Sequence, residues 1–532
     1  MSENLLVYPV STYVMFGLYL IGMVAVGLIW YRKSDNVETY VLGGRGLGSW
    51  VTAMSAQASD MSGWLLMGLP AAVYLGGVQE AWIGIGLAAG TLFNWVYVAA
   101  RLRVYTERTN SLTIASYIGR RFDDPTGLLR KIVAIITFGF FTVYAGSGLV
   151  AAGKLFQEMF HIKYQVAVVI GTLVILIYTL TGGYPAVCWT DFFQGCLMFC
   201  TLLVAPIVAL HYLTPSLINV VDNGAVQTVG VFGSALQSGS INVPVGELSH
   251  TVGLSLMPRE FSWAAIVPII SAVVWGLGYF GQPHIITRFM SIKSHRDLPK
   301  ATTIAMIWVV ISLAAAVAIG LLAVPIYNNP VLDKHEAEKV FLRMIGQLFS
   351  PWLGGVMLAA IMAAIMSTID SQLLASSSML SEDVYASIRK KASPLEMLNV
   401  NRLLVLVITI LAFLMAMWPN DTIFGLVAFA WGGFGAAFGP IVLLSLYCRR
   451  MTWKAALAGM LVGTVVMLGW KFTGTSTLKC APFFKSIYEI LPGFVANLIT
   501  VLVLNLFLKE DRKKVLDDFD YVAGVVKTNE KE

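Results

Sequence analysis

The chain has 532 residues, of which 57% are hydrophobic and only 12% are charged. This composition predicts a polytopic membrane protein, because each helix that crosses a bilayer needs about 20 mostly apolar residues. The formal net charge of +6 does not indicate a nucleic-acid-binding protein. Such a protein carries its basic residues on a folded soluble domain, which this sequence lacks.

Apolar segments of membrane-spanning length recur along the whole chain. We predict thirteen, and an odd number places the two termini on opposite sides of the membrane. Their approximate ranges are 9–31, 48–75, 80–100, 131–156, 164–182, 190–213, 262–282, 301–327, 349–380, 402–419, 423–448, 454–472 and 488–508. The long connection at 214–261 is rich in Gly, Ser, Asn and Val, and the tail after Leu508 is a short polar stretch.

Lys and Arg are distributed unevenly over the connections. One alternate set of connections, which includes the C-terminal tail, holds about three quarters of the 36 basic residues. Connections with excess positive charge tend to stay in the cytoplasm. The N-terminus is therefore predicted to lie outside and the C-terminus in the cytoplasm.

A run of polar and small residues, ASDMSGW at Ala58 to Trp64, interrupts the second apolar segment. An ionised carboxylate such as that of Asp60 is costly inside a bilayer and needs a partner or water. Ser62 and Gly63 let the backbone leave helical geometry and turn carbonyl oxygens toward a ligand. Oxygen ligands suit hard cations, so Na+ is the natural candidate. The alternative is a helix kink in which Asp60 bonds to neighbouring amides.

A second irregular run, WGLGYFGQPH at Trp275 to His284, interrupts an apolar segment half a chain later. Pro283 donates no amide hydrogen, and the three glycines loosen the same stretch. Irregular backbone survives in a membrane only when protein covers it or when it lines a wet cavity. Paired breaks in two halves of a chain predict a transporter with a binding site near the midplane. Four aromatic residues are candidate walls for a small solute, although membrane packing explains any one of them alone: Trp64, Tyr144, Trp275 and Tyr279.

Polar residues also share one face of the segment AAIMSTIDSQ, at 363–372. Ser367, Asp370 and Ser371 follow the i, i+3, i+4 rule on a helix, and Thr368 lies next to them. This face is interpreted as the lining of an ion site. Close helix packing through small hydroxyl residues is the alternative.

Two other classes of membrane protein compete with a transporter. A channel would conduct without a stoichiometric limit, and a transporter-like sensor would bind without flux. The sequence has no repeated filter segment or charged ring of a channel, and no soluble signalling domain. An enzyme is not indicated, since the six histidines are scattered without metal or triad spacing.

Several long motifs resemble those of the solute:sodium symporter family, and in particular of its bacterial members that transport proline. The likeness runs from about Val41 to Phe472. It includes LGGRGLGSWVTAMSAQASDMSGWLLMGLP at 42–70, RLRVYTE at 101–107, WTDFFQ at 189–194, WGLGYFGQPHIITRFM at 275–290, AWGGFGAAFGPIVL at 430–443 and RRMTWKAALAGMLVG at 449–463.

The resemblance implies an all-α fold with a LeuT-like core, in which two inverted five-helix repeats each begin with a broken helix. The expected division gives residues 1–40 to an extra N-terminal helix and 41–213 to the first repeat. It then gives 214–261 to an extracellular connection, 262–448 to the second repeat, and 449–532 to two extra helices and the tail. The expected location is a bacterial cell membrane.

The resemblance also implies that the protein imports L-proline by symport with Na+, without another cofactor or an obligatory protein partner. The sodium site would be formed by carbonyls and hydroxyls of Ala58, Met61, Ala364, Ser367 and Thr368, with Asp60 as the acid needed for coupling. The substrate site would be lined by Ser62, Gly63, Trp64, Tyr144, Trp275, Tyr279 and Pro283. Other family members carry other small solutes, so a different substrate stays an alternative.

One residue departs from the family pattern. Asp370 stands where a small neutral residue is expected. With Asp191 and Ser371 it would form a second cation site, as in relatives that couple to two sodium ions. A cytoplasmic gate and a proton-accepting group are the alternatives, and the sodium stoichiometry stays open.

Overall fold

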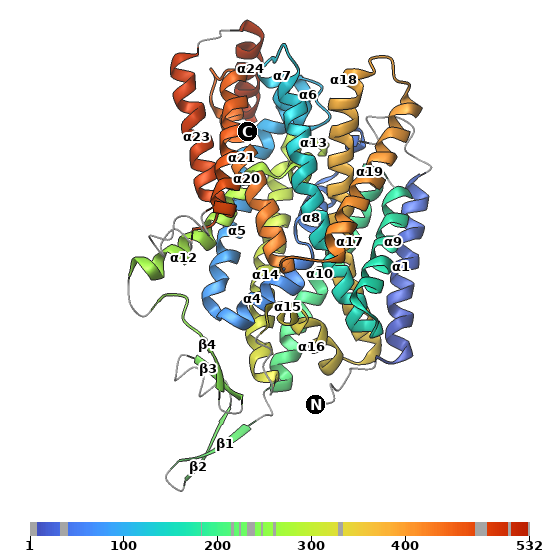
Figure 1. Ribbon diagram of the computed structural model, residues 1–532, viewed down its shortest axis with the longest axis vertical. Coiled ribbons are helices and arrows are strands. Elements are labelled where there is room, and N and C mark those ends of the chain that lie inside the picture. Colours follow the sequence, from blue (N-terminus) through green and yellow to red (C-terminus); the bar gives the residue numbers. More distant parts are fainter. Residues whose placement is uncertain are drawn as a thin grey trace.

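The computed structural model is almost entirely helical, with its helices bundled side by side (Figure 1). It describes residues 8–31, 41–181, 183–213, 217–222, 225–230, 240–245, 248–258, 262–327, 333–473, 487–508 and 512–529. The core is made mainly by central helices: 83% of an 18-residue apolar stretch within Pro351–Ile388 is buried, against 28% of the peripheral helix Ile490–Phe507.

The first half of the described chain supplies one set of helices. In order they are α1 (Val10–Tyr31), η1 (Gly43–Arg45), α3 (Ser49–Asp60), η2 (Trp64–Gly68), α4 (Leu69–Gly76), η3 (Val78–Glu80), α5 (Ala81–Phe93), η4 (Asn94–Ala99), α6 (Ala100–Arg108), α7 (Ile114–Arg121), α8 (Leu128–Phe160), α9 (Tyr164–Thr181) and α10 (Tyr184–Leu213).

The second half of the described chain supplies the remaining helices. In order they are α12 (Trp263–Val273), η5 (Val274–Gly281), α13 (Pro283–Ser291), η6 (His295–Asp297), α14 (Leu298–Ile326), α15 (Lys334–Ala337), α16 (Val340–Leu348), α17 (Pro351–Met379), η7 (Leu380–Tyr385), α18 (Ala386–Ile388), α19 (Pro394–Met417), α20 (Ile423–Tyr447), α21 (Trp453–Thr473), α23 (Ile490–Phe507) and α24 (Lys513–Asn529).

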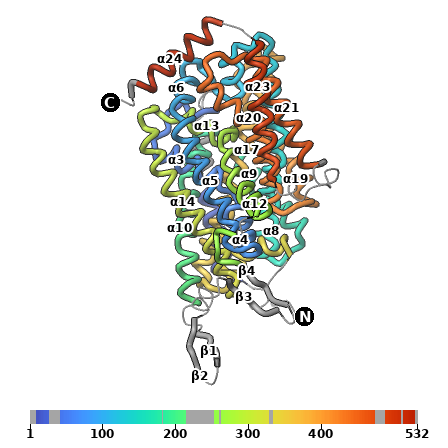
Figure 2. Tube along the Cα trace, turned by 90° about the vertical axis from the view of Figure 1, so that its left-hand side faces the viewer, coloured from blue at the N-terminus to red at the C-terminus, as the bar shows by residue number. Residues whose placement is uncertain are grey.

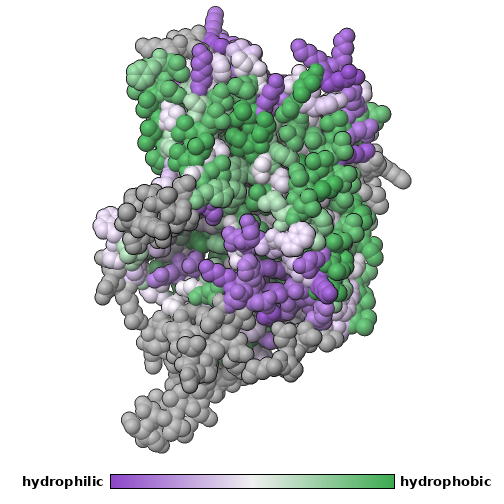
Figure 3. Space-filling view, viewed as in Figure 1, coloured by the Kyte–Doolittle hydropathy of each residue, from purple (hydrophilic) through white to green (hydrophobic). Residues whose placement is uncertain are grey.

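Ten helices in the described part of the chain are long and apolar enough to span a membrane. Three shorter apolar helices, Val10–Val26, Trp64–Gly76 and Tyr164–Ile177, fall within further predicted spans. The total of thirteen stays a prediction. Apolar side chains cover much of the sides of the bundle, and hydrophilic ones gather toward its two ends (Figure 3).

Both predicted breaks are confirmed. At the first break, α3 stops at Asp60, because Met61 takes a non-helical conformation (φ −84°, ψ 77°), and helical structure resumes in η2, which starts at Trp64. In the second, α12 tightens into the 3₁₀ segment η5, Gln282 is extended, and α13 starts at Pro283. Proline is favoured there, since the first turn of a helix does not use its amide hydrogen.

The long connection contains strands that were not predicted. Strand β1 (Leu217–Asp222) pairs antiparallel with β2 (Ala225–Gly230), and β3 (Ser240–Val245) pairs with β4 (Leu248–Gly253). These two hairpins, together with α15 and α16, mark one end of the molecule, called here the hairpin end (Figure 1).

The tail also differs from the polar stretch that was expected. It forms the amphipathic helix α24 at the opposite end, called here the tail-helix end (Figures 1 and 2). Val515, Val522 and Val526 are buried at helical spacing. Asp518 pairs with Arg108 at 3.0 Å, and Asp520 pairs with Arg449 at 2.6 Å. The apolar stripe and these ion pairs hold α24 across the ends of other helices.

The two broken helices are joined to each other at the tail-helix end. Leu47, just before α3, forms a parallel bridge with Ile292, just after α13. Arg45 donates to the carbonyls of Met290 and Ser111, and Arg103 donates to that of Ile292 at 2.6 Å. Cationic side chains thereby satisfy the carbonyls left open where these segments end.

Candidate functional site

The end of α3 and the middle of α17 bring oxygen atoms together. The hydroxyl of Ser367 donates to the carbonyl of Ala58 at 2.7 Å and approaches that of Ala364 at 3.2 Å. The hydroxyl of Thr368 lies 3.4 Å from the carbonyl of Ala58 and 3.1 Å from that of Ala364. Four of the five residues expected at the sodium site therefore meet, and they are fully or almost fully buried.

Met61, the fifth expected residue, caps α3. Its N–H donates to the carbonyl of Gln57 at 2.9 Å. The carbonyl of Asp60 accepts from the indole of Trp64 at 3.2 Å and from the N–H of Ser62 at 3.0 Å. Some backbone groups at the break are therefore hydrogen-bonded to neighbouring residues, since buried backbone groups in a membrane need such partners.

The carboxylate of Asp60 connects the two breaks. Its Oδ2 atom accepts a hydrogen bond of 2.6 Å from the hydroxyl of Tyr279, which lies on η5. Asp60 is 1% exposed and Tyr279 is 1% exposed. This short contact is the direct link between the end of α3, where the oxygen atoms gather, and the aromatic residues of the second break.

The residues expected around the substrate occupy several elements. Trp64 and Tyr144 are buried on η2 and α8, and Pro283 begins α13. Gly63 is packed so closely that an added Cβ atom would lie 2.9 Å from the Cβ of Ala151. The amide of Trp64 approaches the hydroxyl of Ser62 at 3.4 Å.

Trp275 is held in a separate aromatic stack. Its ring lies between Phe424 and Tyr488, at centroid distances of 5.0 and 4.9 Å. The indole of Trp431 donates to the carbonyl of Trp275 at 2.8 Å and packs edge-on against Tyr279. Sequence reasoning missed Trp431, although the glycines around it in AWGGFG indicate a helix that neighbours approach closely.

A guanidinium group lies among the residues suggested for a second cation site. Arg288 of α13 donates to Asp191 at 3.0 Å and to Ser371 at 2.5 Å, and it approaches Ser55 at 3.1 Å. Ser371 in turn approaches Asp370 at 3.4 Å. Arg288 is 2% exposed, and both acids are fully buried.

Sequence reasoning also missed Arg288. Its position within the quoted motif GQPHIITRFM, five residues after a helix-starting proline, was the available signal. A charged residue so close to a break inside a membrane protein calls for a partner of opposite charge.

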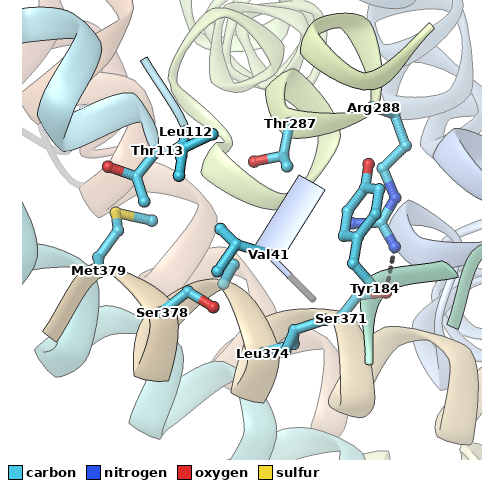
Figure 4. A pocket seen from close by; sticks show the side chains of 11 residues that line it. Val41, Leu112, Thr113, Tyr184, Thr287, Arg288, Ser371, Leu374, Ser378 and Met379 are labelled. Atoms are coloured by element: carbon cyan, nitrogen blue, oxygen red, sulfur yellow. Dashed lines mark hydrogen bonds between the residues drawn. The ribbon is translucent and has the colours of Figure 1, made fainter. Parts of the chain in front are cut away.

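A small cavity lies beside this group (Figure 4). It is lined by Tyr184, Thr287, Arg288, Ser371 and Ser378, among others, and has a volume of about 20 Å³. That volume holds about one water molecule. Figure 4 shows the guanidinium of Arg288 reaching Ser371 beside the ring of Tyr184.

One broken helix gathers carbonyls and hydroxyls against α17, and its carboxylate Asp60 is bonded to the second broken helix through Tyr279. Such paired breaks at the centre of a membrane bundle define a secondary transporter. Comparison with known families agrees. The model of the sodium:solute symporter family matches residues 40–463, and the chain belongs to this family of sodium-coupled transporters, which are not enzymes. It is a multi-pass bacterial membrane protein.

Curated relatives match over nearly their whole length. A sodium/proline symporter of Haemophilus influenzae is 43% identical over 95% of this chain and 96% of its own. A sodium/proline symporter of Escherichia coli is 42% identical over 93% of each chain. The high-affinity proline transporter PutP of Bacillus subtilis is 42% identical over 94% of this chain and 98% of its own.

Solved structures support the fold. A sodium-coupled sialic acid symporter in a substrate-bound outward-open state covers 94% of this chain and 98% of its own, with a TM-score of 0.75 at 19% identity. MhsT in complex with L-phenylalanine gives a TM-score of 0.52 at 15% identity, over 86% of this chain and 97% of its own. The LeuT-like core of inverted repeats with broken first helices is thereby confirmed.

Proposed function

We propose that this protein imports L-proline by symport with Na+. The observation that carries the proposal is the meeting of Ala58, Ala364, Ser367 and Thr368 between a broken helix and α17. The substrate assignment draws on relatives about 40% identical over nearly the full chain that are named sodium/proline symporters. Na+ is the coupling ion of the family.

In the proposed mechanism, Na+ takes the gathered oxygen atoms as ligands, with a carbonyl of Met61 completing the set. Hard oxygen donors suit such a cation. The ion then fixes the end of α3 against α17 and, with it, the position of Asp60. Through its 2.6 Å hydrogen bond, Asp60 orients Tyr279, so sodium binding and substrate binding favour the same conformation.

The proline ring would be enclosed by the aromatic faces of Trp64, Tyr144 and Tyr279. Ser62, Gly63 and Pro283 lie at the two helix breaks and would line the rest of the site. Trp275 would act indirectly. Its carbonyl accepts a hydrogen bond from the indole of Trp431, and this indole packs against Tyr279. Apolar and aromatic walls with a few fixed polar groups suit a small amphiphilic solute.

At the suggested second cation site, we propose that Arg288 supplies the positive charge in this conformation. Its contacts with Asp191 and Ser371 leave a sodium ion little electrostatic advantage there, since like charges repel at close range. A second ion would bind beside Asp370 only after the guanidinium withdraws. We therefore propose transport with one Na+ per proline.

We propose that the tail-helix end faces the cytoplasm and that the N-terminus lies outside. Basic residues gather in the short helices at the tail-helix end, including Arg45 of η1, Arg103 of α6 and Arg121 of α7, in agreement with the positive-inside tendency. The proposed division keeps residues 41–213 and 262–448 as the two repeats. Residues 1–40, 214–261 and 449–532 then lie outside them.

The test is uptake of labelled proline into vesicles that contain the purified protein, with and without an inward sodium gradient. Wild type is expected to accumulate proline only with the gradient, and Ser367→Ala to lose most of this uptake. Thr409→Ala is the control, because it removes a buried hydroxyl bonded within α19. Sodium-independent uptake would contradict symport, and absence of proline uptake would favour another small solute.

A further inference from the structure

A second cavity lies on the side of the bundle near the tail-helix end, away from the transport site. Its volume is about 850 Å³, within the range of ligand pockets. It is lined by Trp95, Val96, Tyr97, Ala100, Arg101, His295, Arg296, Leu298, Pro299, Thr302, Tyr447 and Val526. This set is called here the lateral groove, and its walls come from η4, α6, η6, α14, α20 and α24.

One side of the lateral groove is continuous with the apolar surface of the bundle. Val96 is 53% exposed and Tyr97 is 49% exposed. Phe93 on α5 is also exposed, and its ring lies 5.9 Å from that of Tyr97. Side chains of this kind face lipid tails in a membrane protein, so the groove opens toward the bilayer rather than toward the centre of the bundle.

The other side of the groove is basic. Arg101 donates to the carbonyl of Leu446 at 3.0 Å, and its guanidinium lies 4.2 Å from the ring centroid of Tyr447. Tyr447 donates in turn to the carbonyl of Tyr97 at 2.8 Å. The cation is therefore fixed in place. Arg296 adds a second positive charge, and none of the described residues that line the groove is acidic.

We propose that the lateral groove binds an anionic phospholipid from the leaflet at the tail-helix end. The phosphate would lie against Arg101 and Arg296, which suit phosphate because of their fork of N–H donors. An acyl chain would follow Val96 and Tyr97 into the bilayer. Basic pockets between membrane helices are known places for such headgroups. Val526 of α24 forms part of the wall, so the bound lipid also joins the tail helix to the bundle.

The test measures the melting temperature of the full-length protein in detergent after addition of phosphatidylglycerol, phosphatidylcholine or inorganic phosphate. Phosphatidylglycerol alone is expected to raise the melting temperature of wild type, by several degrees. The double variant Arg101→Gln/Arg296→Gln should lose most of this rise. The double variant Lys390→Gln/Lys391→Gln, which removes two charges at the same end, should keep it.

A second variant tests whether the lipid needs the space of the groove in addition to its positive charges. Ala100→Phe fills the lateral groove and retains both arginines, and it should also lose the rise. In native mass spectrometry, wild type and Lys390→Gln/Lys391→Gln should retain bound phosphatidylglycerol. Arg101→Gln/Arg296→Gln and Ala100→Phe should retain much less of it. An equal rise with phosphatidylcholine, a rise with phosphate alone, or a retained rise in Ala100→Phe would each overturn the proposal.

Discussion

At the scale of single residues, hydrogen bonds to buried charges decide how the site is arranged. Asp60 is almost fully buried, and Tyr279 is the side chain that donates to its carboxylate at 2.6 Å. A hydrogen bond to a charged group contributes about 1.5 to 3 kcal/mol. The proposed coupling between ion and substrate depends on this one contact.

Replacing Tyr279 with phenylalanine keeps the ring and removes the donor. Tyr279→Phe is expected to raise the sodium concentration for half-maximal proline uptake by about tenfold or more, since the lost bond is worth at least about 1.5 kcal/mol. Tyr327→Phe, which removes a hydroxyl that donates to Val340, is the control. An unchanged sodium dependence in Tyr279→Phe would contradict the coupling role of Asp60.

The buried pair of Arg288 and Asp191 provides a second residue-scale prediction. Removing one partner leaves an uncompensated charge, which costs about 3 to 5 kcal/mol. Arg288→Gln is therefore expected to lower the melting temperature strongly. The double variant Arg288→Gln/Asp191→Asn should recover part of the loss, because neither charge remains. Losses that simply add in the double variant would show that the two residues act independently.

At the scale of elements, glycines let the broken segment η5 approach α20. A Cβ atom added to Gly278 would fall 1.9 Å from the indole nitrogen of Trp431, and one added to Gly281 would fall 2.2 Å from the carbonyl oxygen of Phe434. Both distances are much shorter than a van der Waals contact. At these two positions of the interface between the 3₁₀ segment and α20, therefore, no side chain larger than hydrogen fits.

Gly278→Ala is expected to destabilise the protein and to reduce proline uptake, because Trp431 must move away from Trp275 and Tyr279. Overpacking of this kind costs about 1 to 3 kcal/mol. Gly139→Ala on α8 is the matched control, since nothing lies within 4 Å of its added Cβ atom and alanine favours a helix. Equal melting temperatures for the two variants would contradict this account of the interface.

Some elements were predictable from the local sequence, and others were not. Both breaks were predictable, because polar or glycine-rich runs inside apolar segments have no other stable place in a membrane. The helix α24 had a signal in the spacing of Val515, Val522 and Val526, which the polar composition of the tail concealed. The strands of the long connection lacked a comparable signal.

At the scale of the whole molecule, the proposed stoichiometry sets a thermodynamic limit. One charge moving through 100 mV releases about 2.3 kcal/mol, and a tenfold sodium gradient adds about 1.4 kcal/mol. With one Na+ per proline, the accumulation ratio is then limited to about 500-fold. With two ions, the limit would be the square of that number.

Vesicles held at these gradients should therefore accumulate labelled proline to no more than about 500-fold at steady state. With the potential abolished, the limit should fall to about tenfold. A ratio clearly above these limits would show that a second ion is coupled, and that Asp191, Asp370 and Ser371 bind it in another conformation.

The sequence by itself determined the membrane class, the two breaks and the polar face of α17. Each follows from the cost of polar groups in a bilayer, which acts on short segments and leaves a local pattern. Only the tertiary structure decided which of these groups meet. Arg288 reaches Asp191, Tyr279 reaches Asp60, and Trp431 reaches Trp275 across long stretches of chain. Such contacts arise from the packing of whole helices, and no local pattern specifies them.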